Sequence, residues 1–185
     1  MAQYYLVSQL PSLDGIGEDR PLPITEERFL ELCGRFLSKK ALNELKDLTL
    51  LPPREILVTS SPLIEAWNNG ERNLRNALGK VRAEKMGKSF DLENKVLPTE
   101  LIKAANSAIE IENPLKAEKY LNLYRLDFLE TLRPMDNFSL DFIYYYALKL
   151  KLISYIRQFD TEIGETQYKN IYNSIVDGDR LEDKQ

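Results

Sequence analysis

The stretch from 140 to 159, LDFIYYYALKLKLISYIRQF, constrains the fold of this chain more than any other. Most of its residues are aliphatic or aromatic and none is Gly or Pro, so it predicts one helix of about five turns that is covered on most sides. Lys149 and Lys151 lie near its middle, and Arg157 follows. Each central charge would cost about 2.5–3.5 kcal/mol inside a bilayer, so we expect a buried helix of a soluble protein and no insertion into a membrane.

The composition is that of a soluble globular protein. With 185 residues, of which 43% are hydrophobic and 29% charged, the chain suits one domain or two small ones and needs no metal or disulfide to fold. A formal net charge of -4 gives no overall attraction to nucleic acid, so we expect no nucleic-acid partner. Cys33 is the only cysteine and no secretory leader is recognisable, which predicts a cytoplasmic protein without an internal disulfide.

Histidine is absent from the sequence. This excludes Ser-His-Asp and Cys-His catalysis, histidine metal ligands and histidine pH switches. Gly87-Lys88-Ser89 ends like a phosphate-binding loop, but Arg82 stands where that motif requires a glycine, and a helix pattern precedes it in place of a strand. We therefore expect no catalytic residue, no cofactor and no metal ligand. The chemistry that remains open is that of carboxylate, Lys, Tyr or Ser side chains.

Helix signals recur along the rest of the chain. Residues 2–13 fit either a short strand or a short helix, and ILVTS at 56–60 has strand composition but is interpreted as a connection. Asn69-Gly70 is a candidate kink. Together with 140–159, these signals predict an all-α or nearly all-α fold, an irregular bundle of about seven helices. Capping residues and apolar spacing place the other helices at about 25–37, 38–48, 62–86, 98–112, 114–132 and 168–175.

The same signals divide the chain into three parts. We expect an N-terminal helical segment at 1–60, a main helical domain at 61–176 and a flexible tail at 177–185. The alternative is that 1–60 and 61–176 form one domain. No feature of the sequence specifies an oligomeric state.

Basic residues concentrate in the stretch 70–88, GERNLRNALGKVRAEKMGK. Arg75 and Arg82 are seven residues apart and share a helix face beside an apolar strip. This face is either a solvated flank of a core helix or a surface for an acidic protein partner. Together with the charges of 140–159, it supplies the candidate protein-interaction residues: Arg72, Arg75, Arg82, Lys85, Lys149, Lys151 and Arg157.

Four segments resemble, in this order, an uncharacterised bacterial family encoded with V/A-type ATPases: YYLVSQLPSL, ERNLRNALGKVRAEKMG, AEKYLNLYRLDFLETL and FSLDFIYYYALKLKLISYIRQFDTEIG. That family is similar to the C-type subunit of these ATPases, whose eukaryotic counterpart is the d-type subunit. The C-type subunit is usually longer and has three similar helical units, of which this chain could hold at most two. The middle segment resembles the C-type pattern of an acidic residue, an Asn-Leu core and a basic ending at Glu71, Asn73, Leu74, Leu78, Arg82 and Ala83.

The resemblance implies an all-helical protein without an active site, which joins the soluble rotor shaft to the membrane ring or is an accessory of the same complex. Its implied partners are other subunits of the ATPase, and its implied location is cytoplasmic and peripheral on the inner membrane. It further implies that Lys149, Lys151 and Arg157 form a polar edge open to a partner. The alternative is a small helical enzyme or ligand-binding protein that uses carboxylate and Tyr groups in a pocket between helices.

Overall fold

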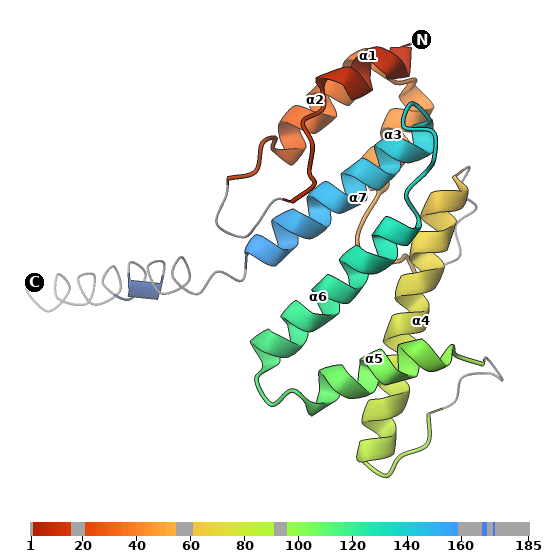
Figure 1. The fold of residues 1–185 in the computed structure, drawn as a ribbon, viewed down its shortest axis with the longest axis vertical. Coiled ribbons are helices and arrows are strands. Elements are labelled where there is room, and N and C mark those ends of the chain that lie inside the picture. The colour runs from red at the N-terminus through yellow and green to blue at the C-terminus, as the bar shows by residue number, and fades with distance from the viewer. Residues whose placement is uncertain are drawn as a thin grey trace, which may run out of the picture.

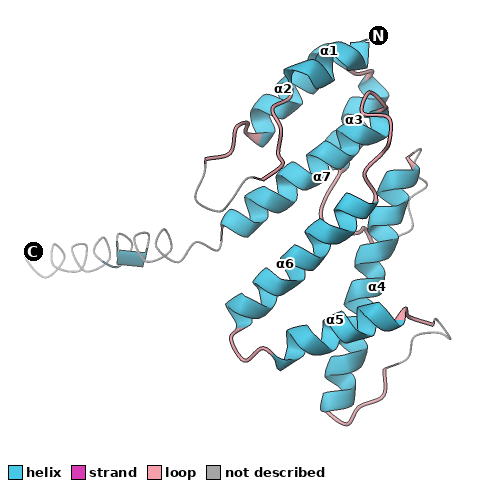
Figure 2. Cartoon of the chain, viewed as in Figure 1, coloured by secondary structure: helices cyan, strands magenta, loops and turns pink. Residues whose placement is uncertain are grey.

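The computed structural model describes residues 2–15, 21–54, 61–90, 96–158, 168–169 and 172. Over these residues the chain forms seven helices and no strand, which confirms the predicted all-α fold (Figures 1 and 2). The strand-like run 56–60, most of the helix expected at 168–175 and the tail 177–185 lie outside the described residues. The helices are α1 (Ala2–Gln9), α2 (Glu26–Phe36), α3 (Lys39–Asp47), α4 (Pro62–Lys85), α5 (Thr99–Glu110), α6 (Pro114–Thr131) and α7 (Leu140–Arg157).

Capping side chains set where most of these helices begin. In five of the seven described helices, an oxygen of the preceding side chain accepts a hydrogen bond from a backbone N–H of the first turn, which satisfies a donor that the helix leaves free. Pro62 and Pro114 stand in the first turns of α4 and α6, where a missing N–H does no harm. The capping residues are Thr25, Ser38, Ser61, Asn113 and Ser139.

The α7 helix lies at the centre of the larger of two hydrophobic cores. All residues from 143 to 150 are buried, so the helix is covered around its full circumference over these turns, where the sequence predicts cover on most sides. Helices α2, α3, α4 and α6 contact it directly, and α1 packs on α2. This larger core therefore contains residues from both sides of position 60. Its most buried members outside α7 are Leu6, Phe29, Cys33, Leu45, Trp67 and Leu129.

Three consecutive tyrosines of α7 connect it to three other parts of the molecule. The hydroxyl of Tyr144 donates to Glu44 of α3 at 2.7 Å, and that of Tyr145 donates to Glu130 of α6 at 2.8 Å. The hydroxyl of Tyr146 donates to the carbonyl of Pro11 at 2.9 Å. Because successive helical residues point about 100° apart, one short run of identical side chains fixes the position of α7 on three sides.

The smaller core lies between the C-terminal half of α4, the α5 helix and the first half of α6. Helix α4 belongs to both cores, because its first turns carry Trp67 into the larger one and its later turns enter the smaller one (Figure 1). None of the described helices is long and apolar enough to cross a membrane. The smaller core consists of Leu74, Ala77, Leu78, Val81, Leu101, Ala105, Ala108 and Leu121.

Gly70 lies inside α4 and does not interrupt it, since the helix continues from Pro62 to Lys85. A Cβ atom at this position would lie 2.2 Å from Cε1 of Phe128, a residue of α6. The Phe128 ring in turn stacks on Trp67, with ring centroids 6.2 Å apart. The glycine therefore gives room for a close crossing of α4 and α6. The predicted kink at Asn69-Gly70 does not interrupt the helix, and Gly70 instead allows close packing.

Candidate functional site

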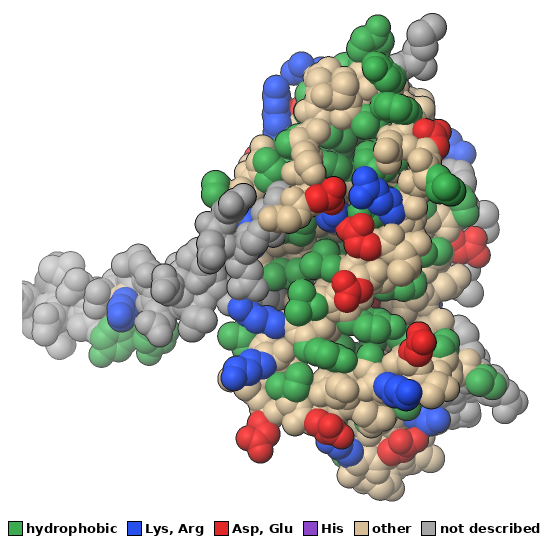
Figure 3. Space-filling view, in the orientation of Figure 1, with side chains coloured by type: hydrophobic (Ala, Val, Ile, Leu, Met, Phe, Trp, Pro, Cys, Tyr) green, Lys and Arg blue, Asp and Glu red, His purple; other side chains and the backbone are tan. Residues whose placement is uncertain are grey.

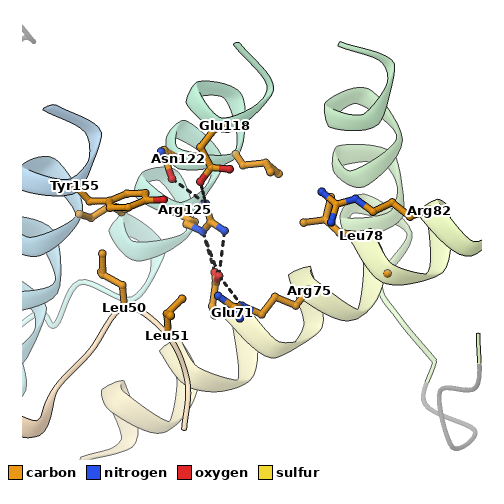
Figure 4. A pocket seen from close by; sticks show the side chains of 13 residues that line it. Leu50, Leu51, Glu71, Arg75, Leu78, Arg82, Glu118, Asn122, Arg125 and Tyr155 are labelled. Carbon is orange, nitrogen blue, oxygen red and sulfur yellow. Dashed lines mark hydrogen bonds and ion pairs between the residues drawn. The ribbon is translucent and has the colours of Figure 1, made fainter. Parts of the chain in front are cut away.

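A polar layer separates the two cores where α4 crosses α6. The Glu71 side chain of α4 is 3% exposed and Asn122 of α6 is 1% exposed, and Arg125 of α6 joins them. Its Nε lies 3.1 Å from Oε2 of Glu71, and Nη2 lies 3.1 Å from Oε1, so the pair is bidentate (Figure 4). Nη1 donates to Oδ1 of Asn122 at 2.8 Å and to Glu118 at 3.3 Å.

The charges in this layer neutralise one another. Burial alone would lower the pKa of Arg125, but the hydrogen bonds and charges of Glu71 and Glu118 together outweigh burial and raise it, so the guanidinium stays protonated. Arg75 also approaches Glu71, with Nε 3.2 Å from Oε1, from a more exposed position on α4. The carboxylate of Glu71 thus accepts hydrogen bonds from two guanidinium groups, which leaves it unsuited to act as a general base.

A cavity of about 650 Å³ opens beside this layer, between α4, α6, α7 and the turn after α3. The Glu71–Arg125 pair lies on its inner wall, and Tyr155 of α7 reaches it from the opposite side (Figure 4). The exposed side chains Leu51, Arg75 and Arg82 lie at its mouth. The remaining wall is mostly apolar and consists of Leu50, Leu78, Gly79, Leu121 and Leu152, with Glu118 and Asn122 as polar members.

The cavity brings together two of the four basic residues predicted on α4. Arg75 and Arg82 both line it, as their shared helix face predicts. Arg72 instead donates to the carbonyl of Pro53 at 2.9 Å, and Lys85 donates to the carbonyl of Ile109 at 3.3 Å. Arg72 and Lys85 therefore fasten α4 to neighbouring segments and do not line the cavity.

The prediction of an open polar edge on α7 is wrong for Lys149 and Lys151, because both amines form ion pairs within the molecule. Lys149 is 7% exposed, and its amine forms ion pairs with Asp14 and, at 2.6 Å, with Glu130. Burial alone would lower the pKa of Lys149, but the hydrogen bonds to both carboxylates outweigh burial and raise it. Lys151 pairs with Glu26 of α2 at 2.9 Å, and Arg157 is partly buried. Lys149 and Lys151 thus hold the N-terminal segment on α7, and the buried Lys149 amine depends on its two carboxylates because a charge removed from water needs a partner of opposite charge.

Glu71 and Arg125 are not among the site residues predicted from the sequence. Glu71 appears there only as part of the C-type subunit pattern, and Arg125 is not singled out. A signal for both exists in the helix spacing. Glu71 follows Trp67 by four residues, and Arg125 follows Leu121 by four, so each charge falls on the inward stripe of its helix. A charged residue on an apolar stripe needs a partner of opposite charge, and two such residues on separate helices are candidates to pair.

A second cavity of about 440 Å³ lies on the other side of the Glu71–Arg125 pair and contacts Gly70, Tyr124 and Phe128. Its charged lining residues among those described are Glu71, Glu100 and Arg125, so this cavity is net acidic. Among the described residues, no group of three or more Asp, Glu or Cys side chains is placed to hold a metal ion.

These features define an all-helical protein in which two cores meet at a buried Glu-Arg pair beside an open cavity. Residues 76–179 match the family described as "Protein of unknown function (DUF2764)". The match spans more than half of the 185 residues, so the chain belongs to this family. It includes Arg82, Asn122, Arg125 and Tyr155 of the cavity. No curated protein and no solved structure matches the chain.

Proposed function

We propose that this protein is a non-catalytic subunit or accessory protein of a V/A-type ion-translocating ATPase, similar to the C-type subunit, and that it acts through contacts with other subunits. The resemblance of four ordered segments supports the proposal. Three of them fall largely on α4, α6 and α7, which contact one another in the fold. In this role the protein works on the cytoplasmic side of the inner membrane, where the complex holds it.

The observation that carries a contact role is an exposed aromatic patch, formed by Tyr4, Tyr5 and Phe138. Tyr4 and Tyr5 open the first resembling segment and Phe138 opens the last, and the rings of Tyr4 and Phe138 are 4.8 Å apart. The three side chains are 56%, 59% and 44% exposed. Hydrophobic side chains gather at this α1 end of the molecule (Figure 3). Exposed aromatic clusters are typical of the centres of protein interfaces, where they bury a large area with little loss of side-chain entropy.

The polar groups of the cavity favour a contact role over catalysis. Glu71 is bound by Arg125 and Arg75, and Glu118 is bound by Arg125. A general acid or base needs a carboxylate that can exchange a proton with a substrate, and both of these are held by guanidinium groups. The basic residues Arg72, Arg75, Arg82 and Lys85 remain candidate contacts of the α4 face.

Affinity purification from the source cells tests the proposal. A tagged full chain, expressed at its native level, should carry V/A-type ATPase subunits with it from detergent-solubilised membranes. Recovery of the chain without any ATPase subunit would refute the proposed function.

A matched pair of variants then tests the patch. Tyr4→Ser with Tyr5→Ser should reduce the recovery of ATPase subunits, because both side chains are exposed and their loss leaves the cores intact. Leu123→Ser with Val96→Ser removes two other exposed hydrophobic side chains, 60% and 93% exposed, and should leave recovery unchanged. If both double variants recover the subunits equally, the ATPase association stands and the patch is not its contact.

A further inference from the structure

We propose that the cavity between α4, α6 and α7 binds a small monoanion with an apolar body, of the class of medium-chain or aryl carboxylates, and that Arg82 is its cationic partner. This inference goes beyond the contact role proposed above and concerns a cavity that no residue of the exposed aromatic patch lines. It rests on the volume of the cavity, the composition of its walls and the balance of its charges.

The volume and the walls suit a small organic molecule. Ligand sites in proteins commonly enclose about 300–1,000 Å³ and combine apolar walls with a few fixed polar groups, and the cavity of about 650 Å³ falls in this range. Leu78, Leu121 and Leu152 are buried at its base, and the Tyr155 ring covers another side. These side chains would bury the apolar body of a ligand.

The charges select an anion. Among the described residues that line the cavity, three guanidinium groups face two carboxylates, which leaves one positive charge without a counterpart. Arg125 is bound to Glu71 and Glu118, and Arg75 is bound to Glu71. Arg82 forms no ion pair or hydrogen bond through its side chain with any described residue, and its guanidinium extends along α4 toward Arg125 (Figure 4). A single unpaired charge beside apolar walls fits a monoanion better than a phosphate dianion.

A second observation also indicates a ligand. Asn122 lines the cavity and is 1% exposed, and its Oδ1 is fixed as an acceptor by Arg125. Its Nδ2 is buried and donates to no described group. A buried donor without an acceptor is energetically unfavourable, and an oxygen of a ligand bound in the cavity would satisfy it. The 440 Å³ cavity is a poorer site for an anion, because its described lining residues carry two carboxylates and one guanidinium.

Calorimetric titration of the purified full chain tests the proposal with three probes of equal chain length: decanoate, decanol and decylammonium, each below its micelle-forming concentration. Decanoate should bind saturably at one site, decanol about tenfold more weakly because it lacks the charge that pairs with Arg82, and decylammonium not measurably because its positive charge is repelled by the guanidinium. Absence of saturable decanoate binding, or equal binding of decylammonium, would overturn the proposal.

Two variants locate the binding. Arg82→Gln should weaken decanoate about tenfold and leave decanol unchanged, whereas Lys103→Gln, which removes an exposed charge of α5 away from the cavity, should change neither. Leu51→Trp replaces an aliphatic side chain at the mouth with a bulky indole ring and should weaken the binding of both decanoate and decanol. Because Arg82 and Leu51 are exposed, thermal unfolding should show intact folding for both variants. Decanoate affinity that is unaffected by Arg82→Gln and by Leu51→Trp would place the probe elsewhere and refute the assignment.

Discussion

Glu71 of α4 and Arg125 of α6 form a bidentate ion pair at the junction of the two hydrophobic cores, with side chains 3% and 14% exposed. The pair lies where each helix leaves one core and enters the other. Its two charges are removed from water, so each depends on the other for compensation. Glu71 and Arg125 line both cavities, so the pair forms part of the same cavity wall as Arg82.

The first prediction concerns this pair. Glu71→Ala leaves the Arg125 charge buried without its main partner and should lower the free energy of unfolding by about 3–5 kcal/mol. Arg75→Ala removes a side chain that is 46% exposed and should cost at most about 1 kcal/mol. Urea unfolding followed by circular dichroism measures both. Glu71→Leu with Arg125→Met should recover part of the loss, because both buried charges are removed and the partners that they leave, Arg75 and Glu118, are 46% and 33% exposed. Equal effects of Glu71→Ala and Arg75→Ala would contradict a buried pair.

The second prediction concerns the two lysines of α7. Lys149→Glu places a third carboxylate beside Asp14 and Glu130 in a buried position, so the chain should lose at least about 3 kcal/mol of stability or fail to fold. Lys151→Glu makes the same change where the side chain is 25% exposed and its partner Glu26 is 39% exposed, and it should cost about 1 kcal/mol or less.

Thermal unfolding compares the two lysine variants, with Lys149→Met as a control. Methionine keeps the apolar stem and removes the amine, and the side chains of Asp14 and Glu130, which are 58% and 41% exposed, can regain hydration. Lys149→Met should therefore be less destabilised than Lys149→Glu. A Lys149→Glu protein as stable as Lys151→Glu would show that the Lys149 amine is solvated.

The third prediction concerns glycines inside helices. Gly70→Ala should destabilise the protein by about 1–2 kcal/mol, because displacement of the Phe128 ring outweighs the gain in helix propensity. Gly34→Ala in α2 is the matched control, since the nearest atom to its new Cβ is Cδ2 of Leu42 at 3.8 Å. That substitution should stabilise by about 0.5–1 kcal/mol. Chemical unfolding of both variants distinguishes close helix packing from a flexible Asn-Gly hinge, for which Gly70→Ala would also stabilise.

The fourth prediction concerns alkaline pH. Burial raises the pKa of Cys33 from 9.0 to about 12, and burial with the Glu130 hydrogen bond raises that of Tyr145 from 10.0 to about 12. The pKa values of Tyr144 and Tyr146 are also raised, chiefly by burial. In each case the unfolded chain loses its proton at a lower pH than the folded chain. Stability is therefore complete below about pH 9 and falls as pH rises toward 12.

Lys149 acts in the same direction, because its raised pKa keeps the folded amine protonated above 10.5, where the unfolded amine loses its proton. Urea unfolding at a series of alkaline pH values measures the decline. Cys33→Ala should remove the earliest part of it, which begins near pH 9. A free energy of unfolding that stays constant between pH 9 and 11 would contradict burial of these groups.

Much of the helical fold is predictable because its signals are local. Thr25, Ser38 and Ser139 cap helices from adjacent positions, so their effect needs no knowledge of distant contacts. For residues 2–13 the sequence fits either a helix or a strand, and the structure has a helix at Ala2–Gln9. The apolar spacing was too short there to distinguish the two periods, and packing of α1 on α2 decides between them.

The candidate site was only partly predictable, because charges alone do not reveal their partners. Arg72, Arg75, Arg82 and Lys85 are alike in the sequence, yet Arg72 and Lys85 bind the carbonyls of Pro53 and Ile109, and Arg75 binds Glu71. Only the three-dimensional arrangement distinguishes Arg82, whose side chain is left without a partner among the described residues and lines the cavity.

The sequence alone predicted the central helix, observed as α7 (Leu140–Arg157), and its cover on most sides, since its composition leaves no polar face and its Lys residues argue against a membrane span. Only the tertiary structure decided what those lysines do. Asp14 lies 135 residues before Lys149, and Glu26 lies 125 residues before Lys151. Folding brings these carboxylates to the amines, because a charge removed from water needs a partner of opposite charge. The lysines that were expected to form an open edge therefore attach the N-terminal segment to α7.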